Sequence, residues 1–358
     1  MSLDIASLRL YNQQLTTHQF KNPVEIVSWF GAMQSQDFAA AKWALALRMN
    51  NHTDTEIEQT FNNGDILRTH IMRPTWHFVA PIDIRWMLEL TSPRVKRFNG
   101  HYYRKSGLDK SIFQKSNEVI RKALVKDNQL TRDEIHVKLE EAHIPTKDLG
   151  LTYSMMQAEL DGIICSGPRR GKQFTYMLLD ERTSKDKEKT LDEALAELTR
   201  RYFKSHGPAQ AKDFSWWSGL TLTDARRGIE LIKTKLVNEE KNGKIYWFFP
   251  PEQEIKLRPD EAFLIPGFDE YFIAYADRSD ILDPNYAKEL NQGGGMINGA
   301  IVIEGKMVGG WKRKFTKKSV ILTIRLFEKI SPRQHESIEK QIERYGNFHT
   351  LPVEIREV

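Results

Sequence analysis

The fold is constrained most by a pattern of three helices and a β-hairpin that occurs twice in succession. In the first copy, Thr131 and Glu134 have the spacing of a capping box, which starts the middle helix. Gly162 closes the third helix, as glycine often does at a helix C-terminus. The expected elements are helices over 111–126, 131–141 and 148–161 and strands over 163–165 and 174–179. This element order predicts a winged helix.

The pattern returns in the next part of the chain. Thr221 with Asp224 opens its third helix, and Asn242-Gly243 is a strong signal for a two-residue hairpin turn because both positions tolerate positive φ. The expected elements are helices over 191–205, 209–217 and 221–232 and a hairpin formed by 236–237 and 245–249. Repetition of one supersecondary unit indicates tandem winged helices.

The two ends of the chain differ from each other. The N-terminal part is interpreted as a third copy, with helices over 3–14, 23–34, 38–48 and 54–61 and a hairpin of 66–71 and 75–80. After Arg258 short strands dominate, and Gly293-Gly294-Gly295 is expected to be a mobile loop. The expected C-terminal elements are strands over 263–265, 300–303, 307–315 and 320–326 and a last helix over 332–345.

Together these patterns predict an α+β chain with three tandem winged-helix units, followed by a small antiparallel β-barrel-like domain. The expected domains are winged helices over 1–100, 101–185 and 186–257 and a β-rich domain with a terminal helix over 258–358.

Composition limits the compartment and the chemistry. The single cysteine, Cys165, excludes an internal disulfide framework and a cysteine-based zinc site. No apolar stretch approaches the roughly 20 residues that cross a bilayer, and the N-terminus lacks a charged and then apolar leader. We therefore expect a cytoplasmic protein. The net charge of +5 is by itself a weak indication of a polyanionic partner.

Two basic clusters are candidates for binding DNA. Winged helices usually place the third helix in a groove and the wing along the backbone. The expected nucleic-acid-binding residues are Arg169, Arg170 and Lys172 on the first wing and Lys312, Arg313 and Lys314 on a later strand. On a strand, Lys312 and Lys314 share one face and Arg313 takes the other. Two alternatives stay open: a basic turn without function, and an edge strand protected by lysine.

Standard catalytic patterns are absent. The sequence has no His-Glu-x-x-His, no Gly-x-Ser-x-Gly and no Walker-type phosphate loop, and its ten histidines are scattered. Periodicity alone favours a structural role for His77. The sequence therefore predicts neither a metal nor a cofactor.

Several segments stand in a recognisable order along nearly the whole chain: Met33–Asp37, Leu67–His77, Ser205–Pro208, Asp213–Leu220, Pro266–Tyr271, Asp277–Ser279 and Gly309–Arg313. Together they resemble one known family, the winged-helix DNA-binding group that includes the AlkZ-like DNA glycosylases. The resemblance implies a C-shaped protein that grips a DNA duplex.

The resemblance also implies that the family's catalytic Gln-x-Gln element falls on Gln34 and Gln36. Glutamine has no accessible pKa, but it accepts and donates hydrogen bonds and so can hold a water. Asp37 is the competing base, although it is also a natural N-cap for the helix that follows. Family members often have proline after this aspartate, where this chain has Phe38, so the local backbone is expected to differ slightly.

The leading hypothesis is a monofunctional DNA glycosylase that removes cationic N7-alkylated purines and unhooks crosslinks, as a nucleoid-associated monomer on double-stranded DNA. Gln36 would hold the attacking water, and Gln34 would orient it or stabilise the sugar cation. One alternative is a DNA-binding transcriptional regulator without catalysis. Another is a protein–protein scaffold, which would lack salt-sensitive DNA binding.

Overall fold

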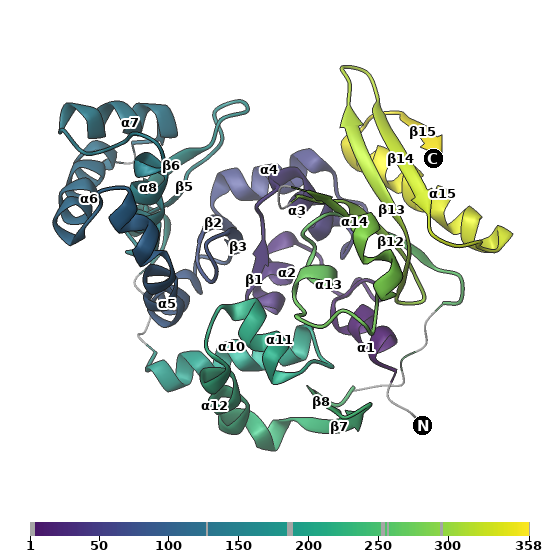
Figure 1. Cartoon of the computed structure of the whole chain (residues 1–358). Coiled ribbons are helices and arrows are strands. Elements are labelled where there is room, and N and C mark those ends of the chain that lie inside the picture. The colour runs from purple at the N-terminus through teal and green to yellow at the C-terminus, as the bar shows by residue number, and fades with distance from the viewer. Residues whose placement is uncertain are drawn as a thin grey trace.

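A computed structural model describes residues 4–126, 128–184, 189–251, 255, 258–293 and 296–357 as a mixed α+β chain. The elements of residues 110–178 lie on one side of the molecule and the long hairpin of β13 (Lys306–Phe315) and β14 (Val320–Leu326) lies on the other, with the N-terminal elements between them (Figure 1). The described part contains no helix long and apolar enough to span a membrane. Among the same residues, no group of three or more His, Cys, Asp or Glu side chains is placed to hold a metal.

The N-terminal part forms a three-stranded antiparallel sheet surrounded by helices. Its elements are α1 (Ile5–Asn12), α2 (Pro23–Phe30), β1 (Ala32–Gln34), α3 (Phe38–Ala46), α4 (Asp54–Asn63), β2 (Leu67–His70) and β3 (Trp76–Val79). The strand order is β1-β3-β2. The predicted helix over 23–34 was wrong at its end: Gly31, at φ 85°, terminates α2, and Ala32–Gln34 pair with β3 instead.

A long helix that the sequence patterns did not indicate follows this sheet. This helix, α5 (Ile84–Lys105), carries Pro93 in its interior. Proline is usually a helix breaker, so it masks the helical pattern on either side. The predicted domain boundary at 100/101 falls inside α5, which packs against helices of both later units.

The first predicted winged-helix region folds around a core of its own. Its elements are α6 (Lys110–Leu124), β4 (Leu130–Thr131), α7 (Arg132–Glu141), α8 (Gly150–Leu160), β5 (Ile164–Ser166) and β6 (Thr175–Leu178), followed by α9 (Leu179–Arg182). The capping box at Thr131 and Glu134 is confirmed. The strands form a sheet in the order β4-β6-β5. Ile120, Leu139 and Met155 belong to a separate apolar cluster beneath it.

The next region repeats the helices and hairpin but shares the main core. Its elements are α10 (Leu191–Ser205), α11 (Ala211–Ser218), α12 (Leu222–Ile232), a short 3₁₀ turn (Lys233–Lys235), β7 (Val237–Lys241) and β8 (Lys244–Phe248). The hairpin turn has positive φ at Asn242 and Gly243, as the sequence predicts. Tyr202 and Trp217 are fully buried in the same cluster as the N-terminal and C-terminal regions.

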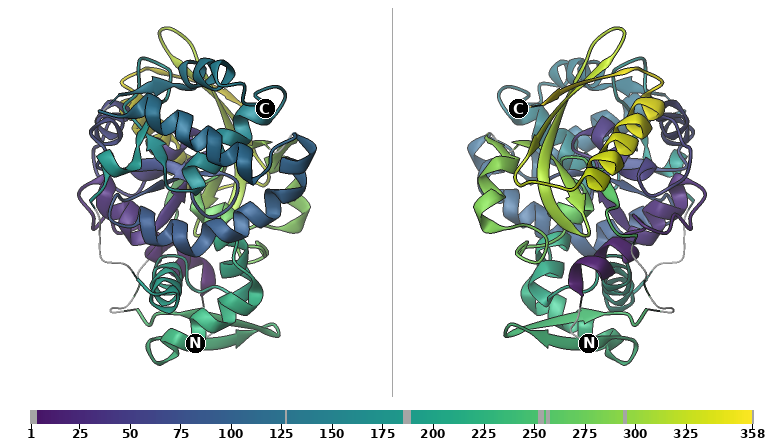
Figure 2. Two further views of the ribbon diagram at one scale, coloured as in Figure 1. Left: turned by 90° about the vertical axis from the view of Figure 1, so that its left-hand side faces the viewer. Right: turned by 90° about the vertical axis from the view of Figure 1, so that its right-hand side faces the viewer.

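The C-terminal region is an open mixed sheet, so the predicted antiparallel barrel was wrong. The sheet has the order β15-β14-β13-β12-β9, with described strands β9 and β15 at its two ends, and β14 pairs with β15 in parallel. Helix α15 (Pro332–His349) lies beside the C-terminal sheet (Figure 2) and packs against β9 and α3. It runs four residues past its predicted end. The other elements are β9 (Ala262–Ile265), α13 (Glu270–Ile273), a 3₁₀ turn (Pro284–Tyr286), α14 (Ala287–Leu290), β10 (Asn291–Gly293), β11 (Met296–Ile297), β12 (Gly299–Ile303), β13 (Lys306–Phe315), β14 (Val320–Leu326) and β15 (Val353–Glu357). Of the glycine loop, Gly294 and Gly295 lie outside the described residues.

Candidate active site

The Gln34–Asp37 segment connects the end of β1 to the start of α3 and is fastened along β3. Gln34 lies opposite His77 in the sheet register. The Ser35 amide donates to the Trp76 carbonyl at 2.8 Å, and the Trp76 amide donates to Oε1 of Gln36 at 3.3 Å. The two glutamines therefore lie at the end of a strand, whose pairing fixes the backbone between them.

Gln34 is held from two sides and is only 9% exposed. Its backbone amide donates to Oε1 of Glu270 at 2.7 Å, and its side-chain Oε1 accepts from Nη2 of Arg73 at 2.9 Å. Gln36, in contrast, is an exposed residue. The structure thus brings both predicted glutamines together at one edge of the sheet, with one buried and one open to solvent.

Asp37 is occupied by structural contacts. Its Oδ1 accepts from the amide of Ala40 at 3.0 Å, which confirms the predicted N-cap of α3. Both of its oxygens also accept from Nη2 of Arg313, at 2.8 and 2.7 Å. A carboxylate with a cap bond and an arginine partner has little remaining capacity to bind and activate water.

Glu270 is the buried charge beneath the segment. Its Oε2 accepts from Nε1 of Trp217 at 2.8 Å and lies 3.4 Å from Nε2 of His206. Burial favours a raised pKa for this carboxyl, but the nearby His206 imidazole, the hydrogen bond from the Gln34 amide and the charge of Arg73 prevail and lower the pKa. Glu270 therefore remains an anion that anchors the end of β1 to α11 and α13.

His77 is a structural residue, as its sequence position suggests. It is fully buried, and its Nδ1 lies 2.9 Å from the Thr75 carbonyl. Burial, with the neighbouring charge of Arg73, lowers the pKa of His77 to about 3. The imidazole is therefore neutral at physiological pH.

Two arginines from the β2–β3 hairpin lie beside the glutamines and were not singled out from the sequence. Nε of Arg68 donates to the Ser35 carbonyl at 3.1 Å, while its guanidinium lies 4.4 Å from the Trp76 ring centroid and 4.5 Å from that of Phe174. Burial lowers the pKa of Arg68 to about 10, which leaves it cationic at neutral pH. Arg73 contacts Gln34 as described. Both lie in the Leu67–His77 segment, so the resemblance gave a signal for the segment but none for these roles.

The predicted wing cations differ in their exposure and in their ion pairs with other side chains. Arg169 is largely committed: Nη1 lies 3.3 Å from Oε1 of Glu58, and its guanidinium lies over the rings of Phe38 and Phe174. Arg170 is more exposed but pairs with Glu134 at 2.8 Å. Lys172 is exposed at the turn, and no ion pair is found for it within the described residues.

The strand cluster divides as its alternation predicts. Lys312 and Lys314 are exposed on β13, whereas Arg313 points inward to Asp37. β13 lies inside the sheet, but the part from Lys312 to Phe315 extends beyond β12 and pairs with β14 alone. The edge-strand alternative therefore holds for this part only, and Arg313 contacts the candidate site.

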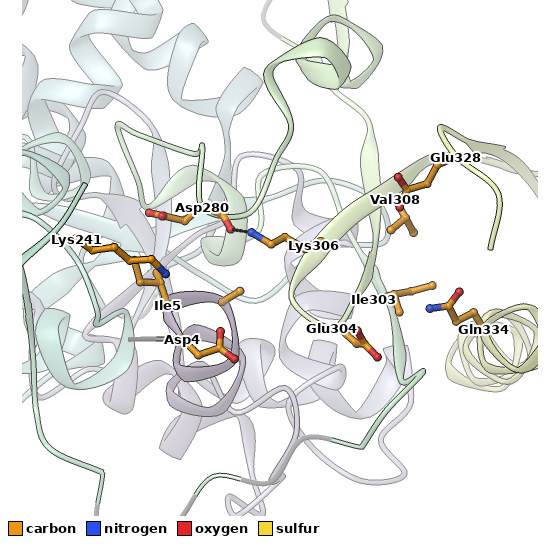
Figure 3. Close-up of a pocket in the computed structure, with 11 residues that line it drawn as sticks. Asp4, Ile5, Lys241, Asp280, Ile303, Glu304, Lys306, Val308, Glu328 and Gln334 are labelled. Atoms are coloured by element: carbon orange, nitrogen blue, oxygen red, sulfur yellow. Dashed lines mark hydrogen bonds between the residues drawn. The ribbon is translucent and has the colours of Figure 1, made fainter. Parts of the chain in front are cut away.

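A separate cavity of about 400 Å³ lies away from this segment (Figure 3). Asp4, Asp280 and Glu304 line it together with Lys306, which donates a hydrogen bond to the Asp280 carbonyl. None of the lining residues comes from Gln34–Asp37. Acidic and basic side chains face one another there, so the cavity does not present the single sign of charge that a DNA groove requires.

Comparison with known proteins places this geometry in context. A family model described as DNA glycosylase AlkZ-like matches residues 27–348. The chain is 22% identical, over 97% of each sequence, to the interstrand DNA cross-link repair glycosylase of Streptomyces sahachiroi. The solved structure of Streptomyces sahachiroi DNA glycosylase AlkZ superposes with a TM-score of 0.81 at 20% identity and covers 98% of each chain, which shows a shared fold.

Proposed function

The chain belongs to the AlkZ-like family of DNA glycosylases, and from this premise we propose that it hydrolyses the N-glycosidic bond of cationic N7-alkylated purines in double-stranded DNA. The proposal includes purines joined in an interstrand crosslink, since that is the substrate named for the similar Streptomyces protein. The observation that carries it is the pair Gln34 and Gln36 at the end of β1, with the neighbouring carboxylate already occupied.

An N7-alkylated purine carries positive charge, which weakens its bond to the sugar before any catalyst acts. In the proposed step the C1′–N9 bond breaks and its electron pair moves onto the base, which leaves as a neutral molecule. The sugar passes through an oxocarbenium-like state. The oxygen of a water bonds to C1′, and the water's proton passes to solvent. No acid is needed for departure, so positioning the water is the main task of the protein.

The side chains around the Gln34–Asp37 segment support this mechanism. Gln36 is exposed and offers an amide oxygen that a water can donate to. Asp37 is engaged by Arg313 and by the amide of Ala40, which argues against it as the base. A site that holds water with amides alone suits a cationic leaving group and suits a neutral base poorly.

We further propose that the duplex is gripped by three tandem winged helices, over 1–100, 101–185 and 186–257, with the C-terminal region opposite. Lys172, Lys312 and Lys314 are exposed and suited to phosphate contacts, Arg170 adds to them at the wing, and Arg169 and Arg313 support the surface from beneath. The protein would act as a monomer, in the cytoplasm and associated with the nucleoid.

The test is base release from a duplex with N7-methylguanine and from a duplex with a guanine–guanine interstrand crosslink. Gln36→Ala is expected to lower the single-turnover rate roughly 100-fold at matched DNA occupancy. Gln59→Ala is the control, because Gln59 is exposed on α4 and, among the residues that the structure describes, its side chain bonds to its helix neighbour Asn63. If wild type releases base from neither substrate while it binds DNA, the protein is a DNA-binding regulator and the proposal is wrong.

A further inference from the structure

The two glutamines have amide orientations that their partners dictate. Oε1 of Gln34 faces Nη2 of Arg73, and Oε1 of Gln36 faces the backbone amide of Trp76. A guanidinium and a peptide N–H only donate hydrogen bonds. Each glutamine must therefore turn its oxygen toward its partner and its NH₂ group away from it.

The two partners are unequal, so the glutamines differ in what they can still accept. Gln36 receives a 3.3 Å bond from a neutral peptide group. Gln34 receives a 2.9 Å bond from a cation. Charge-assisted bonds are about twice as strong as neutral ones. The guanidinium also draws electron density from the Gln34 oxygen, which makes this oxygen a poorer acceptor and its NH₂ group a better donor.

Within the described residues, Gln34 is the side-chain hydrogen-bond partner of Arg73. Arg73 lies on the loop between β2 and β3, and its buried Nε has no hydrogen-bond partner. Within the described residues no carboxylate lies at ion-pair distance from it; Glu270 acts on it only as a nearby charge. Glu270 accepts a hydrogen bond from the Gln34 backbone amide, and its negative charge attracts the Arg73 guanidinium. The anion therefore favours a position of both residues close to one another.

The second polar group of the Gln34 side chain is its NH₂ group. Within the described residues its Nε2 has no hydrogen-bond partner, and it is not a fully buried atom. An amide donor at the edge of the sheet, beside an exposed amide acceptor on Gln36, makes a complementary pair for one water molecule. The water would donate to Gln36 and accept from Gln34, and its other lone pair would stay free.

We propose that Arg73 is a positioning residue that makes Gln34 a hydrogen-bond donor to the nucleophilic water. This inference rests on the proposed glycosylase function. It argues against a role in which the Gln34 oxygen stabilises the sugar cation, because that oxygen already accepts a charge-assisted hydrogen bond from Arg73.

Gln34→Glu separates the two roles. The variant keeps an oxygen for Arg73 and replaces the NH₂ donor by a second oxygen. A donor role predicts a loss of single-turnover base release of roughly 100-fold, similar to Gln34→Ala, at matched DNA occupancy. If Gln34→Glu retains the wild-type rate or exceeds it, Gln34 acts as an acceptor and the inference is overturned.

Arg73 is tested by conservative and non-conservative variants. Arg73→Met frees the amide to turn and is expected to lower the rate at least about 10-fold, while Arg73→Lys, which keeps a cationic donor, recovers part of that loss. Arg97→Met, on an exposed position of α5, is the matched control and should leave the rate unchanged. Equal rates for Arg73→Lys and Arg73→Met would contradict the positioning role.

A double-mutant cycle of melting temperatures tests the contact between Arg73 and residue 34 without an activity measurement. Gln34→Glu should cost little in melting temperature while Arg73 is present, because the introduced carboxylate would pair with the guanidinium. In the Arg73→Met background the same change should lower the melting temperature by at least about 2 °C more, since the new carboxylate would then face Glu270 alone. Equal shifts in both backgrounds would show that Arg73 does not contact residue 34. This cycle remains decisive even if wild type releases no base, the outcome that would refute the function itself.

Discussion

The two clearest repeats have the same order of helices and hairpin, but they are used differently. The unit from α6 to β6 encloses its own apolar cluster, which includes Leu139. It joins the rest mainly through α8 and β5, which pack against α5 and β2. The unit from α10 to β8 has no such boundary, because Trp217 and Tyr202 belong to the cluster that runs through the N-terminal and C-terminal regions. One repeat is an attached module and the other is part of the main body.

The hairpins predicted to be the wings differ in the same way. The turn of the first carries Arg169, Arg170 and Lys172, and the last of these is exposed. The second wing, Val237–Lys241 with Lys244, includes two glutamates, and Lys244 pairs with Asp277 at 2.7 Å. The order of the elements therefore does not predict which repeat contacts a polyanion. What matters is whether the cations of the repeat are already paired with carboxylates of the protein.

The largest expected effect is that of Trp217→Ala. The ring is fully buried, lies 5.0 Å from the Tyr202 ring and 5.1 Å from the His206 ring between centroids, and donates a hydrogen bond to Glu270. Loss of a buried tryptophan costs about 3–5 kcal/mol. Since this unit is part of the main core, the free energy of unfolding should fall for the N-terminal and C-terminal regions together. Hydrogen exchange resolved by segment measures this, and loss of protection confined to 191–248 would contradict the shared core.

Leu139→Ala should have an effect of similar or smaller size, about 2–5 kcal/mol, but confined to one unit. Leu139 is fully buried in the separate cluster. Exchange should accelerate for backbone amides between α6 and β6 and remain slow in the β1-β3-β2 sheet. Equal acceleration in both would show that the attached module unfolds only with the main body.

Acid should destabilise the main body through His77. Its pKa is about 3 in the folded protein, against an ordinary value of about 6.5. As pH falls below 6.5 the unfolded chain takes up a proton that the folded chain does not, so stability declines over this window. Between pH 6.5 and 5 the loss is at most about 2 kcal/mol. Urea unfolding of wild type and His77→Gln should show this part of the slope only in wild type.

The smallest expected effect is on the salt dependence of DNA binding. Lys172→Ala should leave stability unchanged and reduce the slope of log K against log salt by about 1. Lys244→Ala, at the corresponding turn of the other wing, should leave the slope unchanged because Lys244 is already paired. Binding isotherms on an undamaged duplex at several salt concentrations measure both. Equal slopes for the two variants would remove the distinction between the wings.

Local signals were the part of the fold that the sequence predicted well. The capping boxes at Thr131 and Thr221 and the positive φ at Asn242 and Gly243 are confirmed, because each depends on residues within three positions. Signals failed where a distant partner decided. Residues 32–34 were expected to continue the helix that begins at Pro23, yet they form β1 because β3 pairs with them.

The same distinction between local signals and distant partners holds for the candidate site. By itself the sequence determined which residue types stand at Gln34, Gln36 and Asp37 and, through short-range capping, how α3 begins. Only the tertiary structure decided what these side chains are free to do. Gln34 is oriented by Arg73, 39 residues away, and anchored by Glu270, 236 residues away, while Asp37 is occupied by Arg313, 276 residues away. Hydrogen bonds of this kind depend on the packing of separate elements, so no local pattern in the chain encodes them.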